Sequence, residues 1–321
     1  ADSPVVYYRL GESSGSTAVA TVGGNGGYIG TVGTNYLLGR TTSISDNDTS
    51  VGFDGSVGYM TPDNVAQTTD FTIEAWIYPE AIRSQTVAAR QDVDVGYSLE
   101  MTVDGKIKMI ASGTVLGVHT FYSVTGANAL LANTWYYIVG VRDGTSGELR
   151  VYLNGGLDNT SAGLTGTAEN SGANSLRIGS DAYVGGKEFQ GRIDELAMYP
   201  SVLSSIRISA HYSAGAHFAC IGSSVLSSIS FTHLVGTFDD TTKALKLYVN
   251  GTNECSITAT GASVANSDYP LAAGAKINDS ASLVSNSATQ SQMGDIRVYN
   301  SALSPSAISD NYNAVLNRFN P

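Results

Sequence analysis

The sequence predicts an all-β protein whose strands form an antiparallel β-sandwich. Three observations support this fold class. Apolar and polar residues alternate with a period of two along many short segments. Glycine is abundant (36 residues) and proline is scarce (7 residues), and Asn-Gly and Asp-Gly pairs separate the alternating segments, as tight turns between strands require. One stretch of this β pattern also occurs twice along the 321 residues.

The clearest strand is predicted over residues 71–79, which read Phe-Thr-Ile-Glu-Ala-Trp-Ile-Tyr-Pro. Its odd-numbered positions before the proline are apolar and share one face, while Glu74, Trp76 and Tyr78 share the other. Pro79 is expected to end the strand because proline has no N–H for the hydrogen-bond ladder.

Dipeptides with glycine in second place mark the predicted hairpins. A two-residue type I′ turn needs a positive φ at both central positions, and Asn-Gly or Asp-Gly meets that need at low cost. The sequence therefore predicts such turns at three places: Asp104-Gly105, Asn154-Gly155 and Asn250-Gly251.

The internal repeat consists of two blocks. Residues 135–155 and 231–251 share one pattern at a constant offset of 96 positions. Residues 195–204 recur as residues 295–304, at an offset of 100 positions. Both blocks are β units that cannot bury their apolar faces alone, so each copy is expected to belong to a larger sandwich.

Each copy is predicted to end in one short helix. Ser204 is suited to cap the first helix, and Ser304 the second. Pro305 then occupies the first helical position, where its missing N–H costs nothing. Together with the repeat, these endings predict two domains, residues 1–215 and residues 216–321.

Five short motifs follow one another along residues 1–215. They are Tyr8-Arg-Leu-Gly-Glu12, Val51–Tyr59, Phe71–Trp76, Trp135–Gly155 and Gly191–Leu196. Their composition and order resemble the laminin-G-like (LamG-like) jelly roll of the concanavalin A-like lectin/glucanase superfamily. The resemblance implies one complete jelly roll over residues 1–215, with a lectin-like arrangement of rims and loops.

The second copy departs from this family pattern. Only residues 216–230 precede its repeat, whereas residues 1–134 precede the first. Strands that match residues 53–59 and 71–76, and the hairpin at residues 104–105, have no counterpart there. Half a sandwich leaves one apolar sheet face bare and strand edges unpaired. The second domain is therefore expected to be a partial copy.

Three explanations of the partial copy are open. A segment near residues 213–220 is absent from the sequence, a partner chain supplies the missing sheet, or the second copy packs against the first. We favour the first explanation, because Ala214-Gly215 resembles the end of a family domain and His217 begins in the middle of the pattern.

The charge balance limits the classes of partner. The formal net charge is −11, and an acidic surface repels the phosphates of nucleic acids and the headgroups of anionic lipids. No apolar run approaches the roughly 18 residues of a membrane span. We therefore expect neither nucleic-acid binding nor membrane insertion.

Catalysis is not expected. Relatives with this fold cleave glucans, and glycoside hydrolysis needs two carboxylates on either side of the scissile bond. Asp194 and Glu195 are adjacent, so a regular strand would place them on opposite faces. The glucanase pattern Glu-x-Asp-x-x-Glu is absent from the sequence. A glycoside hydrolase remains the disfavoured alternative.

A calcium ion is the metal that the resemblance implies. Related jelly rolls often hold Ca²⁺ near the rim of the sandwich, and hard cations prefer carboxylate and carbonyl oxygens. Ala20 stands where the family commonly has aspartate. The remaining candidate ligands are Glu12, Asn25 and Asp194.

Ligand binding is expected on a loop. Sugar sites combine an aromatic platform with planar polar groups, and sandwich folds carry such groups on their rims. The segment from Asp181 to Lys187, with Tyr183 between them, has this composition, and Tyr122 is a further aromatic candidate. The expected ligands are cell-surface glycans.

The opening residues 1–12 look like the start of LamG-like domains in tailed-phage virion proteins. This resemblance implies a structural or adhesion protein of the virion surface, such as a tail fibre, minor tail protein or capsid decoration. Its expected partners are other virion or surface proteins, further copies of itself, and host glycans. A secreted bacterial adhesin, or an ancillary domain of a glycosidase, is the alternative, and a bond between Cys220 and Cys255 would favour secretion.

Overall fold

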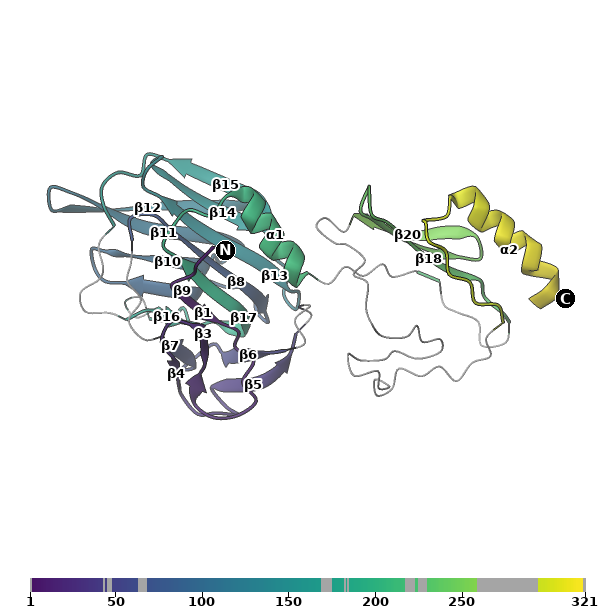
Figure 1. Ribbon diagram of the computed structural model, residues 1–321. Coiled ribbons are helices and arrows are strands. Elements are labelled where there is room, and N and C mark those ends of the chain that lie inside the picture. Colours follow the sequence, from purple (N-terminus) through teal and green to yellow (C-terminus); the bar gives the residue numbers. More distant parts are fainter. Residues whose placement is uncertain are drawn as a thin grey trace. The chain divides into compact units, whose positions relative to one another are not determined.

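A computed structural model shows two compact units, Ala1–His217 and Phe218–Pro321 (Figure 1). Each unit is described by itself. The structure describes residues 2–42, 44, 48–62, 68–168, 175–181, 183, 185–216, 223–224, 230–258 and 294–319. The segment predicted to be absent near residues 213–220 falls mainly on residues 217–220, which lie outside the described residues, and it stays a prediction.

The first unit is an antiparallel sandwich of two sheets, which confirms the predicted fold class. The nine-stranded sheet consists of β1 (Val6–Tyr8), β3 (Ala20–Val22), β5 (Tyr36–Thr41), β6 (Thr49–Asp54), β8 (Phe71–Pro79), β13 (Tyr136–Asp143), β14 (Glu148–Leu153), β15 (Gly156–Ala162) and β17 (Gln190–Tyr199). The eight-stranded sheet consists of β2 (Thr17–Ala18), β4 (Gly26–Ile29), β7 (Tyr59–Thr61), β9 (Gln85–Gln91), β10 (Gly96–Met101), β11 (Lys106–Val115), β12 (Val118–Ala129) and β16 (Arg177–Ile178).

Strand β8 is central to the first unit. It pairs antiparallel with β13 on one side and with β17 on the other. Its apolar positions Phe71, Ile73, Ala75 and Ile77 are buried in the core between the two sheets. A large apolar side chain that is fully buried contributes roughly 1.5–3 kcal/mol, so this strand is a main source of stability.

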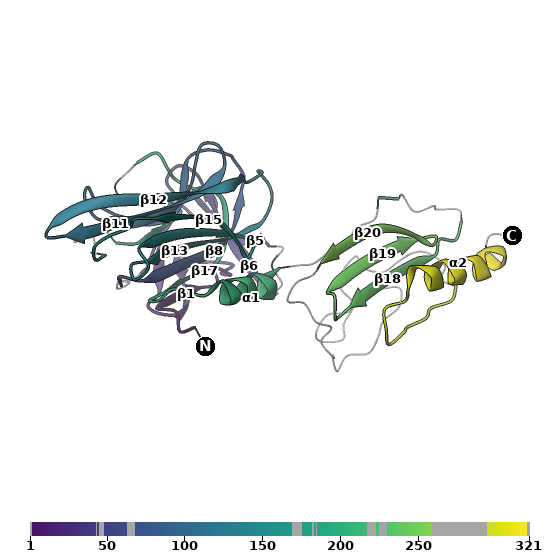
Figure 2. The ribbon, with the colours of Figure 1, turned by 90° about the horizontal axis from the view of Figure 1, so that it is seen from above.

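The opposite face of β8 lies under a helix. Helix α1 (Ser205–Gly215) packs on the outer face of the nine-stranded sheet (Figures 1 and 2). A second apolar cluster joins Trp76 of β8 to Tyr137 of β13 and Ile208 of the helix. The predicted cap is confirmed, because the Ser204 hydroxyl accepts a hydrogen bond from the Arg207 amide at 3.3 Å.

Two of the three predicted type I′ turns are confirmed. Asn154 and Gly155 have φ of 50° and 80°, and their counterparts Asn250 and Gly251 have 49° and 79°. Each asparagine also accepts a backbone N–H with its side-chain oxygen at 3.0 Å, Asn154 from Tyr137 of the neighbouring strand β13 and Asn250 from His233.

The third predicted turn is wrong in type. Only Gly105 has a positive φ (81°), and the Thr102 amide bonds the Lys106 carbonyl at 2.8 Å, so the loop is wider than two residues. The cause is local: the Thr102 hydroxyl donates to the Asp104 carboxylate at 2.5 Å and accepts the Lys106 N–H at 3.0 Å. These side-chain bonds favour an ordinary turn that is followed by a left-handed glycine.

The second unit contains one described sheet, of three antiparallel strands. These are β18 (Leu234–Asp239), β19 (Ala244–Val249) and β20 (Thr252–Thr258), followed by helix α2 (Pro305–Phe319). The Ser304 hydroxyl caps α2 by accepting the Ala307 N–H at 3.2 Å, and Pro305 is the first helical residue, as predicted. The short helix predicted at the end of the second copy is thus confirmed, and the partial nature of this copy stays a prediction.

Candidate functional site

The predicted ligand-binding loop ends beside β9 of the eight-stranded sheet. The backbone carbonyl of Lys187 accepts the Thr86 N–H of β9 at 2.7 Å. The Lys187 side chain then reaches Glu100 of β10, with Nζ to Oε2 at 2.8 Å. On the next strand, Lys108 lies 3.9 Å from the other oxygen of Glu100. One carboxylate is therefore held between two ammonium groups.

Tyr183 is the aromatic side chain of that loop. Its backbone N–H donates to the Asp181 carboxylate at 2.9 Å, and its ring is exposed. Asp181 is buried, so it fixes the loop from below rather than facing solvent. The structure thus gives Asp181 and the buried Glu100 supporting positions, and leaves Tyr183 and the half-buried Lys187 as the surface groups.

Tyr122 does not join this group. In the ladder of β10, β11 and β12 it lies opposite Ala111, which in turn lies opposite the buried Tyr97. Side chains that are directly opposite one another share a sheet face, so Tyr122 faces the core side, whereas Glu100 and Lys108 face outward. Its hydroxyl is 2.7 Å from the Thr165 hydroxyl at the rim.

The predicted calcium ligands already have local partners. Glu12 accepts the Val19 N–H at 2.7 Å and the Tyr28 hydroxyl at 2.8 Å. Asn25 accepts the Ala20 N–H at 3.0 Å, so both side chains tie down the loop around β2 and β3.

Asp194 is fully buried nearby. Burial raises the pKa of Tyr28, and the negative charges of Glu12 and Asp194 act in the same direction. Within the described part of the chain, no group of three or more His, Cys, Asp or Glu side chains could hold a metal ion. The calcium site stays a prediction.

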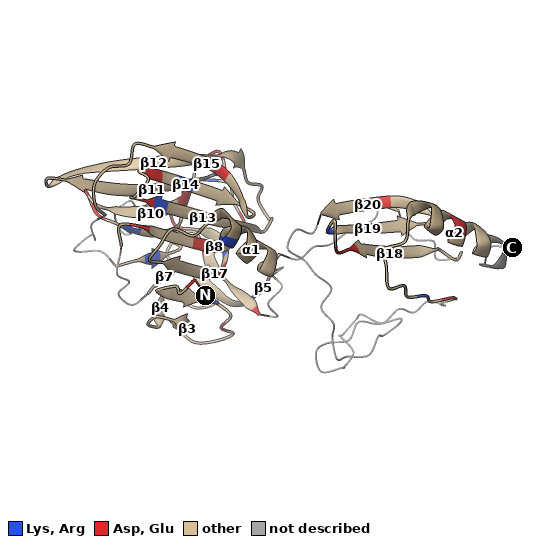
Figure 3. Ribbon diagram, turned by 45° about the horizontal axis from the view of Figure 1, so that its top comes forward, with Lys and Arg blue, Asp and Glu red and all other residues tan. Residues whose placement is uncertain are grey.

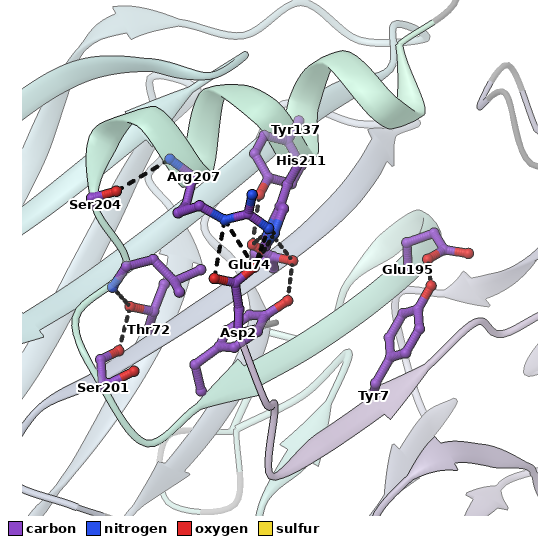
Figure 4. A network of polar contacts seen from close by, with 12 residues as sticks. Asp2, Tyr7, Thr72, Glu74, Tyr137, Glu195, Ser201, Ser204, Arg207 and His211 are labelled. Atoms are coloured by element: carbon purple, nitrogen blue, oxygen red, sulfur yellow. Dashed lines mark hydrogen bonds and ion pairs between the residues drawn. The ribbon is translucent and has the colours of Figure 1, made fainter.

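A buried charged network lies under α1, and we call it the Glu74 network (Figure 4). Glu74 of β8 accepts hydrogen bonds from the Tyr137 hydroxyl at 2.6 Å and the Tyr199 hydroxyl at 2.8 Å. His211 of α1 places Nδ1 3.0 Å from Glu74 and Nε2 3.1 Å from Asp2. Arg207 completes the network with Nε at 3.0 Å from both oxygens of Asp2.

The electrostatics favour the charged forms of His211 and Asp2 in this network. The hydrogen bond between His211 and Glu74 raises the pKa of His211, although burial acts in the opposite direction. The hydrogen bond from Arg207 lowers the pKa of Asp2 to about 2. Burial, followed by the neighbouring Glu74 charge, raises the pKa of Tyr137 and keeps its hydroxyl protonated as a donor.

The Glu74 network is built to hold the helix rather than to transfer protons. Both ring nitrogens of His211 face carboxylates, so neither is left to accept a proton from a substrate. Residue patterns alone do not indicate this network, because His211 matches Asn311 in the second copy and is far from Glu74 in the chain. A glutamate inside an otherwise apolar strand was the one available signal.

The acidic pair at Asp194 and Glu195 also has structural partners. The β17–β8 register shifts here, and Glu195 has a φ of 48°, which marks a bulge. Glu195 accepts a hydrogen bond from the Tyr7 hydroxyl and lies 3.3 Å from Arg9. Buried Asp194 accepts the Glu195 N–H at 3.1 Å.

Two further properties of the chain are its distribution of acidic residues and the character of its helices. Acidic positions occur on the strands and loops of both units (Figure 3), in keeping with the net charge of −11. Among the described residues, neither helix has the length and apolar character that crossing a membrane requires.

Solved structures with similar folds include carbohydrate-binding and receptor-binding domains. Domain 4 of AbnA, an extracellular arabinanase from Geobacillus stearothermophilus in complex with arabinotriose, is 17% identical, with a TM-score of 0.46 over 64% of this chain and 96% of that one. The CBM40 domain of the Ruminococcus gnavus IT-sialidase, bound to α2,3-sialyllactose, is 17% identical, with a TM-score of 0.40 over 46% and 83%.

The binding domain of Botulinum neurotoxin serotype D is 14% identical, with a TM-score of 0.48 over 76% of this chain and 59% of that one. At such low identity these likenesses carry no argument about a ligand. No curated protein matches the chain at a significant level.

The family itself is shown by the sequence match. Residues 53–209, and again residues 204–309, match a laminin-G-type family model described as the concanavalin A-like lectin/glucanases superfamily. The two matches follow the two units, and together they span most of the chain. The chain belongs to the concanavalin A-like lectin/glucanase superfamily.

Proposed function

We propose that this chain is a non-catalytic, lectin-like binding protein that is displayed on a virion surface and contacts host-cell glycans. The observation that carries the proposal is the loop at the eight-stranded sheet in which exposed Tyr183 is close in sequence to Lys187, whose ammonium group is held by buried Glu100. An aromatic ring can stack on a sugar ring, and the half-buried ammonium group can donate hydrogen bonds to the sugar hydroxyls.

The described acidic clusters support a non-catalytic role. Glycoside hydrolysis needs two carboxyl groups that face each other across a gap for substrate. Glu74 and Asp2 are instead joined through the His211 ring beneath α1. Glu100 is occupied by two lysines, and Asp143 is bound by Arg150 at 2.9 Å.

A second candidate has one observation in its favour. Cys255 is disulfide-bonded, and disulfides persist in oxidising compartments. Cys220 lies outside the described residues. A secreted bacterial adhesin, or an ancillary carbohydrate-binding domain of a glycosidase, fits this observation, and it would use the same loop. The placement outside the cell is common to both candidates.

A glycan array probed with the full chain tests the proposal. We expect binding to a restricted set of glycans, with no hydrolysis of the bound sugars. Tyr183→Ala is expected to weaken binding by at least about tenfold, because it removes the aromatic platform. Leu131→Ala is the matched control, because it also truncates an exposed side chain in a loop, and it is expected to leave binding unchanged.

Repeating the array with calcium and with a chelator tests the site predicted at Glu12, Asn25 and Asp194. Binding that is unchanged by the chelator would show that the chain binds glycans without calcium. It would leave the proposed site at Tyr183 and Lys187 unaffected. The absence of any glycan binding by the folded chain, or its retention by Tyr183→Ala, would contradict the proposed site. Release of sugar from a bound glycan would contradict the non-catalytic role.

A further inference from the structure

The hairpin of β11 and β12 in the first unit projects beyond its neighbour β10 (Figures 1 and 2). β10 pairs with β11 only as far as Ala111, whereas β11 and β12 stay paired up to Val115 and Val118. Only Leu116 and Gly117 lie between these two valines, so the hairpin ends in a two-residue turn. A convex end of this kind cannot enclose a ligand, but it can itself enter another surface.

The end of the hairpin consists of exposed aliphatic side chains. Leu116 is 100% exposed, Val118 is 66% exposed and Val115 is 47% exposed. Single exposed aliphatic residues are normal on a protein surface, but three that adjoin at the end of a projection form an apolar patch. We call these three residues the apolar tip.

Leu116 also has an unfavourable backbone conformation. Its φ is 51° and that of Gly117 is 77°, so the turn resembles the one at Asn154 and Gly155, where φ is 50° and 80°. Asparagine tolerates this left-handed conformation better than leucine, because its short polar side chain can form local hydrogen bonds. A fully exposed leucine gains no burial in return for the strain. A strained residue that the fold does not need indicates a function outside the fold.

The projecting hairpin has few groups that resist transfer out of water. Residues 109–141 contain no Asp, Glu, Lys or Arg, although these types make up 14% of the chain. The backbones of β11 and β12 are paired with each other up to the turn. Burying the apolar tip therefore removes no carboxylate, ammonium or guanidinium group from water, and it desolvates few unpaired backbone groups.

The size and composition of the apolar tip fit the interfacial layer of a lipid bilayer. Residues 115–118 extend over two levels of the hairpin, which is roughly 7 Å at about 3.3 Å per residue. Segments that lie in a membrane interface bury their apolar faces to a depth of about 5–10 Å. Protein–protein interfaces are anchored mainly by Trp, Tyr and Arg, whereas Leu and Val are under-represented among their anchors. An aliphatic tip therefore fits lipid better than the pocket of a protein.

The surroundings of the apolar tip favour zwitterionic lipid. Because β9, β10, β11 and β12 follow one another as antiparallel neighbours, the turn after β9 lies at the same end of the sheet as the tip. This turn carries Asp92 and Asp94, and the whole chain has a net charge of −11. These charges repel anionic headgroups but are compatible with headgroups that also carry an ammonium group.

We propose that the apolar tip inserts into the interfacial layer of a zwitterionic lipid bilayer. This contact goes beyond glycan binding and does not use the loop with Tyr183 and Lys187. The sequence argues against a membrane span and against anionic lipid, and neither argument limits a shallow contact of three side chains with zwitterionic lipid.

Flotation of the full chain with phosphatidylcholine vesicles that contain no glycan tests the proposal. We expect a bound fraction that rises with lipid concentration. The partition coefficient should not fall as the salt concentration is raised, because charge attraction does not contribute. Vesicles that also contain phosphatidylglycerol should bind the chain more weakly, because they are anionic.

Leu116→Asn separates lipid binding from stability. It removes the aliphatic side chain and restores the residue found at the matching turns, so we expect the partition coefficient to fall about tenfold while Tm stays unchanged or rises. Val103→Asn is the matched control, because Val103 is 77% exposed in the turn at the other end of β11. It is expected to change the partition coefficient less than about twofold.

Leu116→Trp reports whether the tip itself enters the lipid. Its fluorescence should shift to shorter wavelength when vesicles are added, because the new indole leaves water. The wild-type chain, whose two tryptophans are Trp76 and Trp135, should show no such shift and serves as the control.

Three results would overturn the proposal. One is no flotation of the folded chain with phosphatidylcholine vesicles, and another is equal partition of Leu116→Asn and the wild-type chain. The third is a preference for anionic vesicles. If the chain does not bind lipid but Leu116→Asn loses attachment to cells, the apolar tip belongs to a protein contact instead. None of these results affects glycan binding on the array, so the two proposals fail separately.

Discussion

The two units carry the same repeat in two different states of completion. In the first, β8 lies between β13 and β17, and its apolar face is sealed by the second sheet. In the second, the same hairpin and a matching helix are present, but the described residues include no second sheet. The hairpin and the helix cap are therefore local properties of the repeat, whereas the buried core of the first unit depends on β8 and on a second sheet from distant parts of the chain.

The largest expected difference concerns one matched pair of positions. Met198→Asp buries a charge in the complete core, and we expect it to unfold the first unit, since such a change costs several kcal/mol. Val298→Asp changes the matching exposed residue and is expected to alter the free energy of unfolding by less than about 0.5 kcal/mol. Urea denaturation of both variants checks this, and equal losses would break the comparison.

The Glu74 network gives the next largest effect. Glu74→Ala leaves two buried tyrosine hydroxyls and His211 without their shared acceptor. We expect a loss of about 3 kcal/mol in the free energy of unfolding of the first unit. Asn311→Ala, at the position of the second unit that matches His211, serves as the control and should have a small effect. A loss below about 1 kcal/mol for Glu74→Ala would show that the network does not hold the helix.

The turns should respond equally in both units. Asn154 and Asn250 have the same left-handed φ, and each accepts a matching hydrogen bond, from the N–H of Tyr137 and of His233 respectively. Replacing either by alanine is expected to cost about 1–2 kcal/mol, because alanine lacks the bond and is strained at positive φ. Thermal unfolding of the two variants measures this, and a clear difference between them would mean that the hairpins are not equivalent.

The smallest expected effect is a dependence on pH. The pKa of His211 is raised above its ordinary 6.5, so its charged form stabilises the folded state fully below that pH. This stabilisation is lost as the pH rises through the raised pKa. The difference in Tm between the wild-type chain and His211→Gln should therefore shrink as the pH is raised from below 6.5 into the alkaline range. A difference that grows over this interval would contradict the assigned charge state.

The acid side of the same network has the opposite sign. The pKa of Asp2 is lowered to about 2, so its contribution is present above its ordinary 3.8 and is lost as the pH falls toward 2. Asp2→Asn should match the wild-type chain most closely at the lowest pH at which the chain remains folded.

The sequence predicted what depends on neighbouring residues. Alternation placed β8 and assigned its two faces, and the Asn-Gly pairs and serine caps appear at the predicted positions. The turn type predicted for Asp104-Gly105 was wrong, because side-chain hydrogen bonds of Thr102 compete with the backbone preference of the dipeptide. Such competition is decided by geometry that the residue types alone do not fix.

The arrangement of the candidate site residues could be predicted only in part, for a related reason. The loop with Asp181, Tyr183 and Lys187 was identified by its composition, but its partner Glu100 is 87 residues from Lys187 in the chain. Tyr122 was a reasonable aromatic candidate, yet its face depends on the register between β11 and β12, which contains a shift. The hydrogen bond between Glu74 and His211 joins residues that are 137 positions apart, so no local sequence pattern can predict it.

Amide hydrogen exchange of the two repeats tests the difference between the units most directly. With β8 and the second sheet in place, the amides of β13 should exchange slowly, near the limit set by global unfolding. The amides of β18, which forms an edge of the described three-stranded sheet, should exchange much faster. Equal and strong protection of β13 and β18 would contradict the account, because it would mean that the second unit already has a complete core.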